Sequence, residues 1–270
     1  RLRRQRQMCI RDRGAPPKFQ GKIVMITGGS GTIGFAIAKA FSKLGAQTIL
    51  VDKDEIALKE SVAKLGVGHK YFPIDVTHSD AANQAMLAAI NNFGGLDILI
   101  SNAGAAHAGP MLGISNEELR NAFELNFFSH YSFSTEAAKI LKDQNRGGQI
   151  LFNISKQAVN PGKNFGAYGL PKATTFFLMR QLALELGSDG IRVNGINADR
   201  IRSGLLTDDF ISSRAKSRGV SESEYMAGNL LNKEVTAEHV ADAFTALACA
   251  ESTTGHVMTV DGGNIEASLR

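Results

Sequence analysis

Tryptophan is absent from this 270-residue chain, and cysteine and proline are scarce, at two and six residues. The two thiols, Cys9 and Cys249, form no CxxC pair and have no zinc-ligand spacing, so we expect neither a disulfide framework nor a metal site. This cysteine usage fits a reducing compartment, and we expect a cytoplasmic protein. No run approaches about 18 consecutive apolar residues, so no membrane span and no membrane partner are predicted.

Internal repeats and low-complexity tracts are also lacking, which argues against a solenoid and against a disordered chain. Hydrophobic residues make up 43% of the sequence and charged residues 21%. There is therefore enough apolar surface for a full core, and the length suits a single globular domain, which we place at residues 18–270.

Positive charge is concentrated at the N-terminal end. Residues 1–13 hold six arginines and one aspartate, a net charge of +5, whereas the whole chain carries +4. Without this segment the electrostatic reason to expect a nucleic-acid partner disappears, and we predict none. We interpret residues 1–17 as a disordered basic tail and linker, a remnant of cloning or sequence assembly or a truncation; a basic arm and a targeting peptide are the alternatives.

Short apolar runs alternate with helical patterns along the rest of the chain. This alternation predicts βαβ units, and hence a three-layer αβα Rossmann fold with a doubly wound, seven-stranded, mainly parallel sheet. The predicted strands are residues 22–27, 48–51, 71–74, 97–100, 149–154, 191–196 and 256–260. The predicted helices are residues 33–44, 56–65, 81–93, 168–186 and 236–250, with a further helix opened by the capping box Ser115-x-x-Glu118. Residues 205–232 are predicted to form a helical lid, with an ordinary helical hairpin as the alternative.

A glycine-rich turn follows the first strand and reads Thr27-Gly28-Gly29-Ser30-Gly31-Thr32-Ile33-Gly34. It contains a GxGxxG pattern between a strand and a helix, where glycine lets the backbone approach a pyrophosphate and the helix N-terminus can bind it. The turn therefore predicts a dinucleotide site.

Acidic residues end the next two strands. Asp52 can accept hydrogen bonds from both ribose hydroxyls and would repel a 2′-phosphate, which favours NAD over NADP. Lys53 works against this preference because it could pair with that phosphate. After the third strand, Asp75 and Val76 could reach the adenine edge, although an ordinary turn aspartate is equally compatible.

A tyrosine and a lysine, Tyr168 and Lys172, stand four residues apart and would share one face of a helix. The ammonium should lower the pKa of the phenol, which produces a general acid–base group for interconverting a carbonyl and an alcohol. Pro171 is tolerated only in a first turn, so the helix should start just before it. Ser155 ends the preceding strand, within reach of the same reacting oxygen.

These motifs together resemble the short-chain dehydrogenase/reductase family over about residues 18–265. The glycine-rich turn, Asp75-Val76, Ser101-Asn102-Ala103-Gly104, Ser155 with Tyr168-x-x-x-Lys172, and Asp261-Gly262-Gly263 occur in the family's order and spacing. The resemblance implies an NAD(P)-dependent oxidoreductase that acts on CH–OH groups, and a homodimer or homotetramer.

The resemblance also implies individual roles. Tyr168 would be the acid–base, Lys172 would lower its pKa and bind the nicotinamide ribose, Ser155 would bind the substrate oxygen, and Asn126 would support a proton-relay water. Lys156 is a further candidate for substrate contact. The predicted cofactor contacts are Gly28, Gly29, Ser30, Gly31, Thr32, Ile33, Gly34, Asp52, Lys53, Asp75, Val76, Asn102, Ala103, Gly104, Tyr168, Lys172, Ala198, Ile201 and Ser203.

Several residues depart from the family pattern. Thr32 stands where the short subclass has its second glycine, and Ala198-Asp199 replaces the Pro-Gly after the sixth strand. Lys156 follows the serine where a small residue is usual, and Ser203 replaces a threonine. Lys156, Lys163 and Arg202 are interpreted as loop charges, with a cluster around a substrate phosphate or carboxylate as the alternative.

A narrower resemblance concerns residues 153–172 and 197–206, which are similar to the dehydrogenase half of bifunctional class II aldolase/short-chain dehydrogenases of the rhamnulose-1-phosphate aldolase type. It implies a small hydroxyaldehyde or sugar-derived substrate and a fusion to an upstream aldolase domain. Two other functions stay open: a nucleotide-binding regulator without turnover, and a nucleotide-sugar epimerase or dehydratase.

Overall fold

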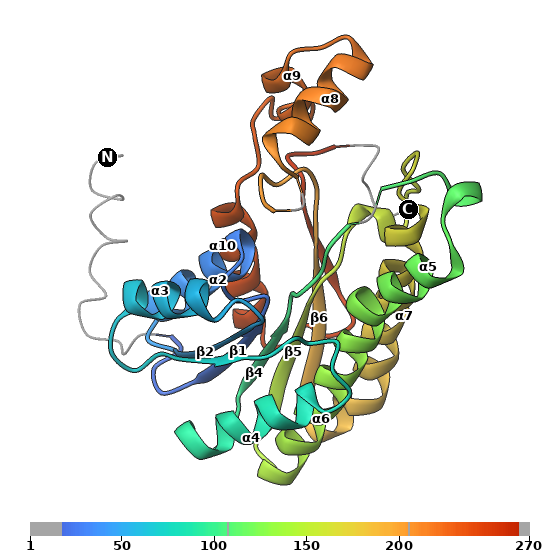
Figure 1. Cartoon of the computed structure of the whole chain (residues 1–270). Coiled ribbons are helices and arrows are strands. Elements are labelled where there is room, and N and C mark those ends of the chain that lie inside the picture. The colour runs from blue at the N-terminus through green and yellow to red at the C-terminus, as the bar shows by residue number, and fades with distance from the viewer. Residues whose placement is uncertain (1–17, 107, 205, 265–270) are drawn as a thin grey trace, which may run out of the picture.

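The computed structural model describes residues 18–106, 108–204 and 206–264, and Figure 1 shows the arrangement of their elements. The predicted tail and linker at residues 1–17 lie outside these ranges. Within them the chain forms a central sheet with helices on both faces, as the alternating pattern predicts.

The sheet has seven strands in the order β3-β2-β1-β4-β5-β6-β7, and every neighbouring pair is parallel. The strands are β1 (Ile23–Thr27), β2 (Gln47–Asp52), β3 (Lys70–Pro73), β4 (Ile98–Ser101), β5 (Gly148–Asn153), β6 (Ile191–Ala198) and β7 (Val257–Val260). The strand order changes direction between β1 and β4. In open parallel sheets, ligands bind beyond the carboxyl ends of the strands at such a point.

Two groups of helices cover the sheet (Figure 1). One face packs against α2 (Thr32–Lys43), α3 (Glu55–Leu65) and α10 (Ala237–Cys249), and the other against α4 (Ala81–Phe93), α6 (Ser129–Gln144) and α7 (Gly166–Leu186). The helix α5 (Asn116–Phe123) continues through the π-helical turn η2 (Glu124–Phe128) into α6. Beyond the carboxyl edge of the sheet lie α8 (Asp208–Arg218) and α9 (Glu222–Met226); the short turns are η1 (Met111–Gly113), η3 (Lys156–Ala158) and η4 (Gly187–Asp189).

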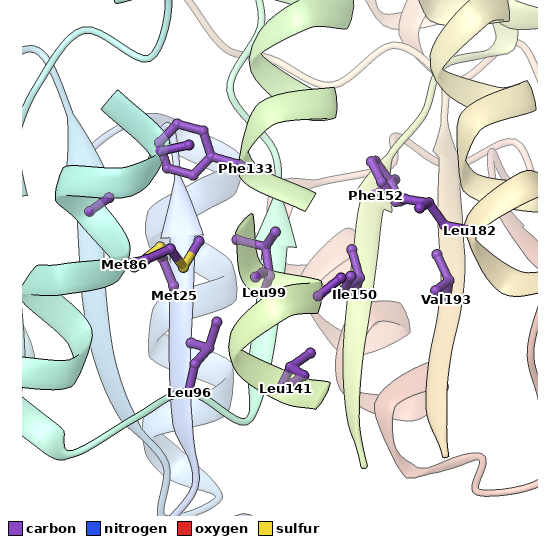
Figure 2. Packing of buried hydrophobic residues seen from close by; sticks show 14 of the residues in the cluster. Met25, Met86, Leu96, Leu99, Phe133, Leu141, Ile150, Phe152, Leu182 and Val193 are labelled. Atoms are coloured by element: carbon purple, nitrogen blue, oxygen red, sulfur yellow. The ribbon is translucent and has the colours of Figure 1, made fainter. Parts of the chain in front are cut away.

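Alternation along the strands divides the core between the two faces. In β1, Met25 joins the cluster with Phe133 and Phe152 that Figure 2 shows, whereas Ile26 packs on the opposite face with Phe41. All five of these side chains are at most 1% exposed. This period of two, with both faces buried, is why the strands read as nearly continuous apolar runs.

The structure corrects the expected start of α7. The helix begins at Gly166, so Pro171 lies in its second turn rather than at its start. Proline has no N–H to donate to the carbonyl of Ala167, one turn earlier, and one helical hydrogen bond is lost there. The other end, at Leu186, is as predicted.

Candidate active site

A cleft of about 1520 Å³ opens above the carboxyl ends of the strands. Most of the predicted site residues line it. They are Gly28, Gly31, Thr32, Ile33, Gly34, Asp52, Lys53, Asp75, Val76, Asn102, Ala103, Gly104, Ser155, Lys156, Tyr168, Lys172, Ala198, Ile201 and Ser203. Gly29, Ser30 and Asn126, which were also predicted, are not among the lining residues.

The glycine-rich turn packs so tightly that side chains would not fit. Gly28 has φ +64°, and a Cβ on Gly34 would collide with the Gly28 carbonyl oxygen. A Cβ on Gly29 would lie 2.8 Å from Cβ of Leu50, so this glycine packs against β2 instead of facing the cleft. Gly31 caps α2 without a side-chain hydrogen bond, which leaves the first N–H groups of the helix available to an anion.

The carboxylate of Asp52 is held in a fixed orientation. Its Oδ2 accepts hydrogen bonds from Ser30 Oγ at 2.7 Å and from Ser30 N at 3.3 Å, and its Oδ1 accepts one from Lys53 N at 2.8 Å. Ser30 therefore orients Asp52 from outside the cleft. The turn and the end of β2 together fit the phosphate and ribose parts of a dinucleotide.

The carboxylate of Asp75 is also held by hydrogen bonds, which come from its own loop. Its Oδ1 accepts hydrogen bonds from the amide and the hydroxyl of Thr77, at 3.0 and 2.8 Å. The bond from the amide, with smaller effects of the Thr77 hydroxyl, Lys53 and His78, holds the pKa of Asp75 below its ordinary value. The carboxylate is thus favoured in its charged form, and Asp75 lines the cleft together with the buried Val76.

Asn102 joins the ends of three neighbouring strands. Its Nδ2 donates to the Thr27 carbonyl at 2.9 Å, its amide donates to Thr27 Oγ1 at 2.9 Å, and its Oδ1 accepts from Asn153 Nδ2 at 2.9 Å. Its side chain thus bonds to the protein at the floor of the cleft. Sequence reasoning missed Asn153, although a polar residue at the end of an apolar strand was the available signal.

Ser155 and Tyr168 meet at the centre of the cleft. They are 9% and 8% exposed, and the Ser155 side chain favours the phenolate form of Tyr168. Burial has the larger, opposite effect and raises the pKa of Tyr168 to about 12. The pKa decrease that the sequence led us to expect from Lys172 is absent, because burial disfavours the charged form of both groups.

Lys172 lies behind the tyrosine and is 2% exposed. Its Nζ donates to the Asn153 carbonyl at 3.0 Å and lies 3.4 Å from His130 Nε2 and 5.8 Å from the centre of the Tyr168 ring. Burial lowers its pKa to about 7. An ammonium has three N–H donors, so with two of them bound to protein, one remains for the cleft.

His130 is a neighbour of the site that sequence reasoning did not single out. It is 1% exposed, and its Nδ1 lies 2.6 Å from Ser101 Oγ. Burial and the Lys172 charge hold its pKa well below the ordinary value, so the ring is neutral and its Nε2 can accept from the ammonium. Its place on α6, four residues after Asn126, was the only available signal.

Asn126 lies in the π-helical turn η2, beneath Gly104. Its Nδ2 donates to the carbonyls of Ala105 and Ala122, and the backbone carbonyl of Asn126 accepts a hydrogen bond from Thr175 Oγ1 at 2.7 Å. Its Oδ1 is buried and has no hydrogen-bond partner among the described residues. A Cβ on Gly104 would lie 2.8 Å from that oxygen and 3.5 Å from Lys172 Nζ, so glycine permits this close packing.

Lys156 and Asp199, which both depart from the family pattern, form an ion pair. Lys156 Nζ lies 2.7 Å from Asp199 Oδ1, and Asp199 is 7% exposed. Arg200 and Asn264 complete the surroundings of this carboxylate. Lys156 lines the cleft as predicted, but its charge is paired within the protein, which weakens its candidacy as a substrate ligand.

The segment predicted as a lid forms α8 and α9, and Phe210, Arg214 and Tyr225 from it line the cleft. Lys163 lines the cleft as well. Arg202 does not, because it pairs with Asp208 and Glu234 on the surface.

In residues 18–106, 108–204 and 206–264, no set of three His, Cys, Asp or Glu side chains could hold a metal ion. No helix in these ranges combines the length and apolar character needed to span a membrane.

Known proteins share this architecture. A sequence model of the family described as enoyl-(acyl carrier protein) reductase matches residues 28–264. The chain is 33% identical, over 92% of its length, to the uncharacterized oxidoreductase YuxG of Bacillus subtilis, of which it spans only 38%.

Two solved structures agree with the same fold and with a nicotinamide site. L-sorbose reductase from Gluconobacter frateurii, complexed with NADPH and L-sorbose, is 27% identical with a TM-score of 0.84, covering 92% of this chain and 98% of that one. The 3-ketoacyl-(acyl-carrier-protein) reductase from Brucella melitensis, complexed with NADH, is 25% identical with a TM-score of 0.81, covering 91% and 99%. The chain therefore belongs to the short-chain dehydrogenase/reductase family and is an NAD(P)-dependent oxidoreductase acting on CH–OH groups.

Proposed function

We propose that this protein is an NAD-dependent dehydrogenase or reductase that interconverts an alcohol and a carbonyl on a small hydroxyaldehyde or sugar-derived substrate. The observation that carries the proposal is that the nearly buried side chains of Ser155 and Tyr168 line the same cleft, with Lys172 buried beside the tyrosine ring. Ser155 would orient the substrate oxygen, and Tyr168 would give or take the proton at that oxygen.

The glycine-rich turn, Asp52 and Asp75 would hold a nicotinamide dinucleotide with its adenosine half over β2 and β3. The bound cofactor supplies or accepts the hydride. Lys172 would use its remaining N–H on the cofactor ribose while Asn153 and His130 fix the other two. Asn126, beneath Gly104, would support the proton path from Lys172, as the family resemblance implies.

Substituting Tyr168→Phe tests the acid–base role. Turnover should fall by a factor of about 10² to 10⁴, the size of a lost general acid–base contribution, while the cofactor dissociation constant stays unchanged. Tyr131→Phe on α6 is the matched control, because that ring is 47% exposed and lies outside the cleft lining. Undiminished turnover in Tyr168→Phe would refute the mechanism.

The preference for NAD rests on the oriented carboxylate of Asp52. Wild-type protein should show a higher kcat/KM with NAD than with NADP, because a 2′-phosphate would lie against this negative charge. Asp52→Ala should shift the ratio toward NADP, whereas Lys53→Ala should shift it further toward NAD. A wild-type preference for NADP would contradict the assignment.

The substrate class and a possible aldolase fusion rest on the narrower resemblance of residues 153–172 and 197–206. YuxG is much longer than this chain, which supports the idea that such a domain can be one part of a larger protein. The direct test is turnover of lactaldehyde, small diols and sugar alcohols with each cofactor. A substrate confined to large apolar alcohols would contradict this assignment.

A homodimer or homotetramer is the further proposal. Leu170, Phe177 and Leu184 recur every seventh residue on α7 and are 46%, 68% and 79% exposed, and Phe128 on η2 and Tyr131 on α6 are exposed as well. An apolar stripe of this kind is typical of a contact between copies. Sedimentation of wild type and of Phe177→Glu should show an oligomer that the charge weakens; a monomeric wild type would refute it.

A further inference from the structure

Three cations in the cleft have no anionic partner among the residues that the structure describes. Lys163, Arg214 and Arg218 all line the cleft, and none of them forms an ion pair or a side-chain hydrogen bond with any residue that the structure describes. By contrast, Lys156 and Arg200 in the same cleft are paired with Asp199. The three cations come from α8 and from the loop before α7, which together form one part of the cleft wall.

The carboxylates of the cleft do not neutralise this wall. Asp52 and Asp75 follow β2 and β3 at the proposed cofactor half, and Asp199 is already shared by two cations. The remaining carboxylate, Glu124, lies in η2, which packs against α5, α6 and α7 rather than α8. The substrate end of the cleft therefore carries an uncompensated positive charge.

Arg214 is the best fixed of these cations. Its guanidinium carbon lies 5.3 Å from the centre of the Phe165 ring and 5.6 Å from that of Phe210, and the two rings stand 5.9 Å apart. Its Nε is buried and lacks a hydrogen-bond partner among the described residues. Aromatic contacts hold a guanidinium in place and leave its planar edge for bidentate binding of a carboxylate or phosphate.

The Arg214 guanidinium packs against a residue next to the proposed acid–base group, Tyr168. Phe165 caps α7, and its carbonyl accepts the backbone N–H of Tyr168 at 3.1 Å. Arg214 therefore contacts the residue one helical turn before Tyr168, so a ligand of a few carbons could reach both side chains.

We propose that the substrate carries an anionic group, a carboxylate or a phosphate, which Arg214 binds with support from Lys163 and Arg218, on the same short carbon chain as the reacting hydroxyl or carbonyl. This rests on the proposed dehydrogenase function. It narrows the substrate from any small hydroxy compound to a hydroxy acid or a phosphate ester.

Matched three-carbon substrates test the proposal. We expect wild-type kcat/KM to be higher for glycerate or glycerol phosphate than for neutral glycerol, and the better of the two identifies the anion. Arg214→Leu should lower kcat/KM for the anionic substrate by about 10- to 100-fold, as for a lost charged hydrogen bond, and leave glycerol nearly unaffected. Lys163→Gln, at an exposed position, should give a smaller loss of the same kind. Equal losses on anionic and neutral substrates in Arg214→Leu would overturn the proposal.

Arg180→Leu is the matched control. Arg180 also contacts an aromatic ring, Phe176, at 5.9 Å, but it lies on the exposed side of α7 and does not line the cleft. This variant should retain the wild-type preference between substrates.

A second measurement does not depend on turnover. Calorimetric titration of the NADH-saturated protein with inorganic phosphate and with glycolate should show binding that Arg214→Leu weakens at least about tenfold and Arg180→Leu does not. If no alcohol is oxidised but this binding is present, the proposed function fails and the anion site stands. If neither anion binds wild type, or if Arg214→Leu binds equally well, the anion site is refuted.

Discussion

Replacing Lys172 by methionine should make the protein more stable near neutral pH, while removing part of the active site. Burial lowers the pKa of Lys172 from 10.5 to about 7. A decrease of that size corresponds to roughly 5 kcal/mol of unfavourable free energy for keeping the charged ammonium inside the fold. Methionine has a similar volume and no charge, so it avoids this cost.

Part of the gain is offset. The variant loses the hydrogen bond from Lys172 to the Asn153 carbonyl, and an unpaired buried carbonyl costs about 1–3 kcal/mol. We therefore expect Lys172→Met to unfold with a free energy about 2–4 kcal/mol higher than wild type at pH 6.

The lowered pKa of Lys172 also makes the free energy of unfolding of the wild type depend on pH, in a direction that can be worked out. Between about pH 7 and 10 the unfolded wild-type chain binds a proton that the folded protein does not, so the free energy of unfolding should rise with pH. Below pH 7 both states are protonated, and the full cost is present. Above pH 10 the raised pKa of Tyr168, about 12, reverses the trend, because the unfolded tyrosine loses its proton first.

Urea unfolding at pH 6 to 9.5, followed by far-ultraviolet circular dichroism at one protein concentration, measures this difference. The wild-type free energy should climb toward that of Lys172→Met as the pH rises, because only wild type has the buried lysine. Lys139→Met, at a side chain that is 67% exposed, should behave like wild type. Parallel pH profiles for wild type and Lys172→Met would refute the reasoning.

Substitutions at three further positions probe the surroundings of the site. Gly34→Ala should abolish cofactor binding and destabilise the fold by about 1–3 kcal/mol, since the new Cβ meets the Gly28 carbonyl; cofactor titration and urea unfolding measure both effects. Asn102→Ala should cost about 1–3 kcal/mol in urea unfolding, because it removes the side-chain bonds between three strand ends. His130→Phe should shift the pKa of Lys172 lower still in the pH–rate profile, and His130→Gln, which restores an acceptor, should largely reverse the shift; identical profiles would show that the histidine only fills space.

Much of the fold and of the cofactor half of the site could be predicted from local pattern. Strand and helix periodicity depends on neighbours in the chain, and in a parallel sheet every strand delivers its last residues to one edge. That rule alone placed Asp52, Asp75 and Asn102 at the cleft, and the spacing of Tyr168 and Lys172 placed both on one helix. The tight turn at Gly28 and Gly34 was likewise evident from residue type.

Other features depend on residues that are distant in the chain. The pairing of Lys156 with Asp199 explains two departures that looked unrelated in the sequence, and the contact of Arg214 with Phe165 joins α8 to the start of α7. The pKa of Tyr168, which is raised where the sequence led us to expect a decrease, also depends on residues that are distant in the chain. Spacing along a helix says that two groups are close, but the cost of charging them depends on how much water the surrounding elements exclude, and that is decided only when the sheet, α6 and α7 pack together.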